Sequence, residues 1–305
     1  ALPIFHTHGL FVATNTLLLA GGTMLFLERF DAETVVRLMP QATAMMGVPT
    51  YYTRLLAHPD FDRALARGMR LFISGSAPLS AEVHKAFFER TGHAILERYG
   101  MSETGMNTSN PYDGERRPGT VGLPLPDVQL RITDPETGAL RPRGEVGVIE
   151  VKGPNVFTGY WGLEEKTAEA FRADGWFVTG DLARIDDDGY VHIVGRDKDL
   201  IISGGFNVYP AEVEAHLDAL AGVAESAVIG VPHPDFGEGV TAVVALEPGA
   251  KLSEDEVRQA LAGELARFKQ PKRVFFVPTL PRNAMGKIQK VSLRETYRDT
   301  YTGDR

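Results

Sequence analysis

The chain has 305 residues, 43% of them hydrophobic and 24% charged, which is typical of a folded globular protein. Its formal net charge of −8, with Lys and Arg scattered, offers no basic patch for nucleic acid or an anionic membrane, so neither partner is expected. The absence of cysteine excludes disulfides, thiolate metal sites and a cysteine nucleophile, so any thiol in the chemistry must come from another molecule. We expect a cytoplasmic protein; its oligomeric state has no signal in the sequence.

The N-terminal segment is apolar but interrupted. Residues 2–5 predict a buried strand, and the apolar run over residues 17–26 is expected to belong to a core. Two histidines precede that run, two glycines break it and no basic stretch leads into it, which argues against a signal peptide or a membrane span. The chain begins with Ala1 and enters the predicted strand directly, so we interpret it as cut.

From residue 1 to about 111, short apolar runs alternate with helical patterns. Residues 44–48 and 70–74 predict buried strands, and Asp31 and Ser80 are candidate N-caps of the helices that follow them. This order predicts an α/β layer with a largely parallel sheet.

From about residue 115 to 194 the hydrophobic pattern changes to alternation with a period of two, as at residues 129–132 and 148–151. Turn signals such as Asp174-Gly175 separate the runs. The pattern predicts an antiparallel sheet or small barrel, whose last hairpin spans residues 176–194.

The segment from Lys198 onward carries its own apolar core, so a separate α+β domain is predicted, with the boundary at residues 195–197. Its predicted strands are 200–202, 224–231, 241–246 and 274–277, and its predicted helices are 211–217 and 253–266.

Two polar strings fall on the predicted sheets. Residues 99–104, Tyr-Gly-Met-Ser-Glu-Thr, follow a strand predicted at 94–98, where ligands collect in open α/β sheets. Thr179-Gly180-Asp181 lies on the last hairpin, where one carboxylate can accept hydrogen bonds from both hydroxyls of a ribose. Taken singly, each string is equally well explained as an ordinary turn.

Two further strings lie in the C-terminal part. Residues 195–210 place alternating charges before a Gly-Gly turn and a helix that Pro210 can start. Residues 281–288, Pro-Arg-Asn-Ala-Met-Gly-Lys-Ile, present Lys287 directly after a glycine. A charged linker or a solvated lysine explains parts of these strings but not the whole of the first.

In this order and spacing the four strings, from His6 to about Leu293, resemble the adenylate-forming superfamily of acyl-CoA synthetases, luciferases and peptide-synthetase adenylation domains. The resemblance implies the C-terminal part of a large α/β plus β-barrel domain over residues 1–196, with an α/β part at 1–114 and a β-rich part at 115–194. A small mobile α+β domain over 197–305 follows. It also implies an AMP-forming acid–thiol ligase of fatty acid metabolism that uses ATP, Mg²⁺ and coenzyme A.

The resemblance assigns roles to individual residues. Lys287 matches the mobile catalytic lysine, Glu103 the catalytic glutamate linked to Mg²⁺, and Asp197 the hinge. The implied nucleotide contacts, besides Lys287, are Gly75, Ser76, Ala77, Glu97, Tyr99, Gly100, Met101, Ser102, Asp181 and Arg196. The implied coenzyme A channel is formed by Ser203, Gly204, Gly205 and Phe206.

The identity of the acid rests on Arg98, which precedes the Tyr-Gly-Met string. A guanidinium beside the acyl pocket calls for an anion, and a second carboxylate on the substrate satisfies it. With His6 and Ser76 as further donors, the chain is similar to malonyl-CoA synthetases, which use malonate and often methylmalonate. The alternative is that Arg98 pairs with Glu97 or Glu103 of the chain itself.

The sequence departs from the superfamily because no Ser/Thr/Gly-rich phosphate loop ending in Lys occurs upstream of His6. Three alternatives to malonate ligation therefore stay open: another acid, transfer to a carrier-protein thiol, and an inactive truncated remnant that binds nucleotide. The preference between malonate and methylmalonate is likewise open.

Overall fold

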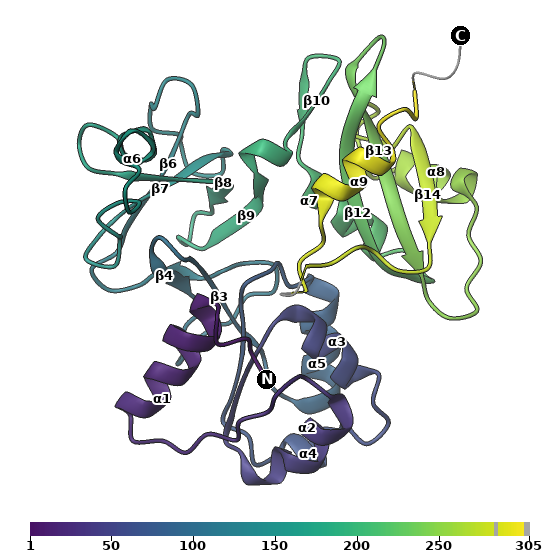
Figure 1. Ribbon diagram of the computed structural model, residues 1–305. Helices are drawn as coiled ribbons and strands as arrows, with labels where there is room; N and C mark the ends of the chain where they lie inside the picture. Colours follow the sequence, from purple (N-terminus) through teal and green to yellow (C-terminus); the bar gives the residue numbers. More distant parts are fainter. Residues whose placement is uncertain (284–285, 302–305) are drawn as a thin grey trace. The chain divides into compact units, whose positions relative to one another are not determined.

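The structure, a computed structural model, describes residues 1–283 and 286–301. It divides into two compact units. The first comprises residues 1–179 and 183–193, and the second comprises residues 180–182 and everything described from Val194 onward (Figure 1). The division falls near the predicted boundary at 195–197, while the hinge at Asp197 stays a prediction.

The first unit is built on a mixed sheet in the order β1-β2-β3-β4-β5. The first three strands pair in parallel, as predicted, and the last two are antiparallel. The strand predicted at 94–98 begins two residues later. The strands are β1 (Ala44–Gly47), β2 (Leu71–Ser74), β3 (Leu96–Met101), β4 (Gly105–Ser109) and β5 (Leu123–Pro124).

Short helices accompany this sheet (Figure 1). The side chains of Asp31 and Ser80 accept hydrogen bonds from the backbone N–H groups of Thr34 and Val83, at 2.9 and 3.2 Å, which confirms both predicted N-caps. A buried aromatic core of Tyr52, Phe61, Phe72 and Phe87 fixes the helices on the sheet. The helices are α2 (Ala32–Leu38), η2 (Met39–Gln41), α3 (Pro49–Leu56), α4 (Arg63–Ala66) and α5 (Ala81–Thr91).

The N-terminal segment corrects two predictions. Residues 2–5 form no strand, and the side chain of Phe5 is 75% exposed. A π-helix, η1 (His8–Asn15), runs into α1 (Thr16–Leu19), and Leu19 is 90% exposed, so this run is not core. The apolar pattern predicted burial, but no element in the described part of the chain covers this side of the helix.

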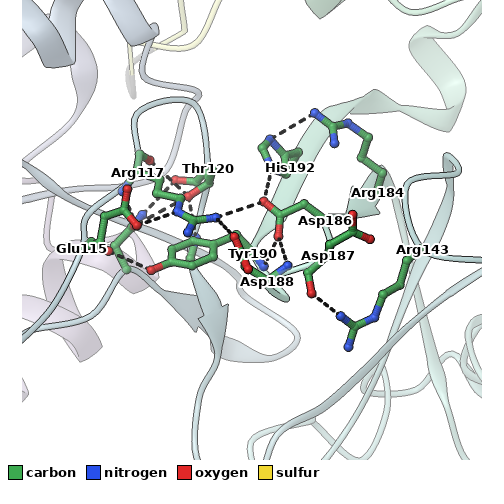
Figure 2. Close-up of polar contacts among 12 residues, drawn as sticks. Glu115, Arg117, Thr120, Arg143, Arg184, Asp186, Asp187, Asp188, Tyr190 and His192 are labelled. Carbon is green, nitrogen blue, oxygen red and sulfur yellow. Dashed lines mark hydrogen bonds and ion pairs between the residues drawn. The ribbon is translucent and has the colours of Figure 1, made fainter.

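A four-stranded sheet in the order β6-β7-β8-β9 follows, as the period-two alternation predicted. Figure 2 shows the polar network at the turn of its last hairpin. Arg117 pairs with Glu115 and Asp188 at 2.9 and 2.7 Å and lies over the ring of Tyr190, while Asp186 bonds to His192 at 2.9 Å. This network fixes the hairpin turn. The elements are β6 (Gln129–Thr133), β7 (Gly147–Lys152), α6 (Glu164–Ala170), β8 (Phe177–Ile185) and β9 (Val191–Arg196).

The second unit has its own sheet in the order β11-β10-β13-β12, with β14 parallel to β13. Its core is a cluster of aliphatic side chains, among them Ile201, Leu217 and Val244. The helix predicted at 253–266 ends at Ala262, before a glycine. The elements are η3 (Asp197–Asp199), β10 (Ile201–Ser203), β11 (Phe206–Val208), α7 (Pro210–Asp218), β12 (Val223–His233), β13 (Gly237–Leu246), α8 (Glu254–Ala262), β14 (Arg273–Val277) and α9 (Lys290–Thr296).

None of the helices within residues 1–283 and 286–301 is long and apolar enough to cross a membrane.

Candidate active site

A pocket lies in the first unit where the start of η1 meets the carboxyl ends of β2 and β3. Parallel strands end together at one edge of a sheet, and ligands bind at that edge in α/β folds. The pocket is lined by His6, Thr7, His8, Val12, Gly75, Ser76, Arg98, Gly100, Met101, Gly105 and Met106. All three residues predicted to bind the acid, His6, Ser76 and Arg98, are in this set.

His8 is the most deeply placed polar residue of the pocket, and the sequence prediction, which named His6, did not include it. Its Nδ1 lies 3.0 Å from Oγ of Ser76, and its backbone N–H donates to Nδ1 of His6 at 3.3 Å. Burial, aided by the charges of His6 and Arg98, lowers the pKa of His8 to about 4. His8 is therefore neutral at pH 7 and acts as a hydrogen-bonding group. The string His-Thr-His contained the signal but did not distinguish its two rings.

Arg98 presents a half-buried guanidinium to this pocket. Its Nε donates to Oγ of Ser109 at 3.2 Å. Burial lowers its pKa, and no carboxylate contributes to the shift. In the described part of the chain no salt bridge joins it to Glu97 or Glu103, which removes the alternative of an internal ion pair. Adjacent strand residues point to opposite faces, so Glu97 cannot reach its neighbour's guanidinium.

Glu97 is 4% exposed. Its Oε1 accepts a hydrogen bond from the backbone N–H of Leu79 at 3.2 Å, while Oε2 has no partner among the described residues. Burial raises the pKa of Glu97 to about 8, so the carboxyl is largely neutral at pH 7. Glu97 thus joins β3 to the loop after β2. The next inward residue, Tyr99, is also buried and packs in a core with Val121 and Ile149.

The loop after β2 is held in an unusual conformation. Ser76 has φ of 72°, in the left-handed region that non-glycine residues rarely occupy. Such a residue costs on the order of 1–3 kcal/mol and persists when its surroundings fix it. The contact between Ser76 and His8 provides that constraint, and the predicted nucleotide residues Gly75 and Ala77 flank it on the same loop.

The hairpin between β3 and β4 is tight, which places its tip against the pocket. A Cβ on Gly100 would lie 1.9 Å from the carbonyl oxygen of Gly105, so only glycine fits there. Met101 lines the pocket, and Oγ of Ser102 accepts a hydrogen bond from Oγ1 of Thr7 at 3.2 Å. Residues 99–104 of the hairpin, which the sequence singled out, therefore contact the N-terminal segment that contains His6 and His8.

Glu103 lies at the hairpin tip, where Oη of Tyr160 donates to its Oε1 at 3.1 Å. In residues 1–283 and 286–301, no group of three or more His, Asp or Glu side chains is arranged to hold a metal ion. A single carboxylate still fits Mg²⁺, because this ion is commonly held by one or two carboxylates together with substrate phosphates and water. Glu103 is suited to hold such an ion, which would neutralise phosphate charge.

The predicted ribose contacts meet in the second unit. Nε of Arg196 lies 3.0 Å from Oδ1 of Asp181, whose side chain is buried. Lys287 is half-buried; burial lowers its pKa, the charge of Arg196 lowers it further, and Asp181 opposes that shift. The backbone N–H of Lys287 donates to Oδ1 of Asn283 at 3.0 Å. Ala284 and Met285 of the predicted lysine string lie outside the described residues.

The predicted coenzyme A loop is the turn between β10 and β11. Gly204 and Gly205 have φ of 60° and 81°, the geometry of a two-residue hairpin turn that glycine favours. Ser203 is buried, and the exposed ring of Phe206 stacks on Phe268 at 4.7 Å between centroids. The loop is thus a two-residue turn followed by a partly exposed aromatic ring.

Two family models match the chain: AMP-binding enzyme over residues 1–161, and AMP-binding enzyme C-terminal domain over residues 212–287. The chain belongs to the AMP-binding enzyme family. The adenylate-forming fold predicted from its motifs is thereby confirmed.

Known AMP-binding enzymes resemble the chain over nearly all of its length. It is 41% identical to a feruloyl-CoA synthase from an Amycolatopsis species over 301 residues, which is 97% of this chain and 61% of that protein. It is 39% identical to a malonate–CoA ligase from Arabidopsis thaliana over 326 residues, 97% of this chain and 53% of that protein. The ATP-bound crystal structure of MatB from Rhodopseudomonas palustris has a TM-score of 0.97 and 62% identity, covering 99% of this chain and 60% of that one. The chain thus spans between about half and three-fifths of the length of these relatives.

Proposed function

We propose that the protein containing this chain ligates malonate, with methylmalonate as a second acid, to coenzyme A through an acyl-adenylate, releasing AMP and pyrophosphate. In this reaction one carboxylate of the acid attacks the α-phosphorus of ATP and pyrophosphate leaves. The thiol of coenzyme A then attacks the acyl carbon, and AMP leaves. Both steps depend on positioning and on charge neutralisation more than on a protein nucleophile.

The observation that carries the proposal is the half-buried guanidinium of Arg98 in a pocket where the described residues supply no carboxylate. A buried cation without a counter-ion is costly, and a dicarboxylate whose second carboxylate accepts hydrogen bonds from the guanidinium removes this cost. Neutral His8 and Ser76 add hydrogen-bonding groups without adding charge. The pocket is therefore complementary to a small dicarboxylic acid whose second carboxylate takes no part in the reaction.

The resemblance to a feruloyl-CoA synthase makes an aromatic acid the competing substrate. The feruloyl-CoA synthase and the malonate–CoA ligase, at 41% and 39% identity, do not distinguish the two acids. The pocket favours the diacid, because Val12, Met101 and Met106 supply only part of a wall whose remainder is polar or glycine. An aromatic ring would leave the Arg98 guanidinium desolvated and unpaired, at a cost of several kcal/mol.

For the remaining groups the proposal follows the family match. Lys287 neutralises the attacking carboxylate and phosphate, and Glu103 holds Mg²⁺. Asp181 and Arg196 contact the ribose. The adjacent ion pair and half-buried ammonium in the second unit support these roles. The Gly204-Gly205 turn is assigned to the channel for the pantetheine thiol.

The test is acid-dependent exchange of pyrophosphate into ATP, measured with malonate, methylmalonate, acetate and ferulate. It is run on the 305-residue chain and on a version extended upstream with the segment that its relatives possess. We expect exchange with malonate to exceed that with acetate or ferulate by about a hundredfold or more, because only a diacid pairs with Arg98.

The possible results separate the alternatives. A preference for ferulate or acetate would overturn the malonate assignment while leaving adenylation intact. Exchange in neither version would favour the inactive remnant. Transfer from the adenylate to a carrier protein but not to coenzyme A would favour the carrier-loading alternative.

A further inference from the structure

A clamp formed by residues 153–160 surrounds the tip of the β3–β4 hairpin, although the hydrogen-bonded partners lie 48 to 57 residues apart in sequence. Nδ2 of Asn155 donates to the carbonyl oxygen of Thr104 at 2.9 Å and to Oδ1 of Asn107 at 3.1 Å. The backbone N–H of Phe157 donates to the carbonyl oxygen of Glu103 at 2.8 Å. These bonds fix the backbone on which the Glu103 side chain is mounted.

The clamp also reaches the Glu103 side chain itself. Oη of Tyr160 donates to Oε1 at 3.1 Å, and no bond to Oε2 is present among the described residues. A hydrogen bond to one oxygen restricts the rotation of the carboxylate and leaves the second oxygen available to another ligand. This is the arrangement by which outer hydrogen bonds orient a metal-binding carboxylate.

Tyr160 is in turn held rigidly. Its backbone N–H donates to Oγ1 of Thr167 on α6 at 2.9 Å, and its ring packs edge-on against Phe157 at 4.8 Å. A Cβ on Gly159 would lie 2.6 Å from the Thr167 side chain, so this turn admits only glycine. The position of the Tyr160 phenol relative to Glu103 is therefore set by these contacts.

The surroundings of the phenol keep it a donor. Burial, followed by the charge of Glu103 and the hydrogen bond to it, raises the pKa of Tyr160. Nζ of Lys166 lies 5.6 Å from the centre of its ring, where a cation interacts favourably with the aromatic face. A phenol is protonated at physiological pH even at its ordinary pKa of about 10, so the hydroxyl is the donor in this bond.

We infer that Tyr160 is a positioning residue that orients the Glu103 carboxylate for the divalent cation bound with the nucleotide. This inference rests on the proposed function, because that function supplies the metal–nucleotide substrate. Tyr160 touches neither cation nor substrate; it acts through Glu103 alone.

The test measures binding of Mn²⁺ to the protein complexed with α,β-methylene-ATP, by electron paramagnetic resonance, in the upstream-extended protein. Outer hydrogen bonds to metal ligands are typically worth about 10- to 100-fold in metal affinity. We therefore expect Tyr160→Phe to weaken Mn²⁺ binding about tenfold, with the affinity for metal-free nucleotide unchanged within twofold. The phenylalanine keeps the ring packing, and the thermal unfolding midpoint verifies that the fold is intact. Tyr112→Phe, which removes a half-exposed phenol from the same unit, is the matched control and should bind Mn²⁺ like the wild type.

A double-mutant cycle separates positioning from a general structural role. In a Glu103→Gln background, Tyr160→Phe should cause no further loss of Mn²⁺ binding. Wild-type affinity in the Tyr160→Phe variant, or a second loss in the Glu103→Gln background, would overturn the inference alone. A wild-type protein that binds no Mn²⁺–nucleotide would overturn both the inference and the proposed function, whereas one that binds it without adenylating malonate would overturn only the latter.

Discussion

Arg98 and Arg196 are two arginines of predicted function in opposite electrostatic situations. In the first unit, Arg98 is half-buried and bonds to a serine hydroxyl, and no carboxylate of the described chain pairs with it. In the second unit, Arg196 has a side chain that is 46% exposed and an ion pair with Asp181. Solvent and a partner already stabilise the second charge. The charge of Arg98 depends on a bound anion. Arg98 therefore indicates which kind of substrate the pocket accepts, whereas the ion pair of Arg196 indicates only the local structure.

The most direct challenge to this contrast is Arg98→Ala. Removing one member of a buried, hydrogen-bonded charge pair costs about 2–5 kcal/mol. We therefore expect kcat/KM for malonate to fall by about 10³-fold while KM for ATP changes less than threefold, measured by pyrophosphate exchange.

Two matched variants accompany this experiment. Arg196→Ala should raise KM for ATP about tenfold and leave the malonate preference unchanged, since its charge is already paired and exposed. Arg70→Ala removes an exposed arginine just before β2 and should alter neither parameter. Equal loss of malonate and ATP use in Arg98→Ala would contradict the diacid pocket.

A smaller effect is expected at Lys287, where burial and Arg196 both disfavour the charged form. Lys287→Ala removes one stabilising charge from the adenylating step, which typically costs about 10²- to 10³-fold. Thioester formation from supplied malonyl-adenylate should proceed at nearly the wild-type rate, because that step needs no charge between carboxylate and phosphate. The two half-reactions are followed separately by single-turnover kinetics; equal slowing of both would remove the assigned role.

The smallest expected effect is on the free energy of unfolding. It tests whether Glu97 is neutral in the folded chain, so that its charge does not balance the charge of Arg98. The folded state raises the pKa of Glu97 from 4.5 to about 8, so between these values the folded chain holds a proton that the unfolded chain releases. The free energy of unfolding therefore decreases as pH rises through this window and levels off above it. Between pH 6.5 and 8 the loss amounts to about 1.6 kcal/mol, because the full slope of 1.36 kcal/mol per pH unit falls to half at pH 8, where the folded carboxyl is half-ionised.

Glu97→Gln should abolish this decrease, as measured by urea unfolding at pH 6.5, 7.2 and 8. Burial lowers the pKa of the N-terminal ammonium of Ala1, which makes stability rise with pH in this window and so acts in the opposite direction. His8 does not disturb the measurement, because its pKa shift affects stability only between about pH 4 and 6.5, where stability rises with pH. A decrease that persists in the variant would show that another group titrates.

The second unit and the capped helices were predicted well, because each apolar run there is buried by neighbouring elements of the same unit. Val213 and Leu217 on α7, for example, pack against Val228 and Val244 of the sheet beside them. The run over residues 17–26 has an equally apolar pattern, yet Leu19 lies in solvent. Periodicity predicts which side of an element is apolar, but it does not predict whether another part of the chain packs against that side.

The candidate site divides in the same way. The resemblance predicted Ser76 and Arg98, which both line the pocket, and Glu103, which lies at the tip of the β3–β4 hairpin. The additional pocket residue His8 lies at the start of a π-helix, and π-helices have no strong sequence signature. The bond between Tyr160 and Glu103 joins positions 57 residues apart, which no local pattern indicates.

The left-handed backbone of Ser76 limits how the range of accepted acids can be changed. Only glycine and, at modest cost, asparagine or aspartate adopt this conformation readily, so larger residues at position 76 would distort the loop before they reshaped the cavity. Met101 and Met106 line the same cavity with flexible thioether side chains in ordinary backbone conformations. Engineering toward bulkier dicarboxylates should therefore vary the two methionines and leave the serine in place.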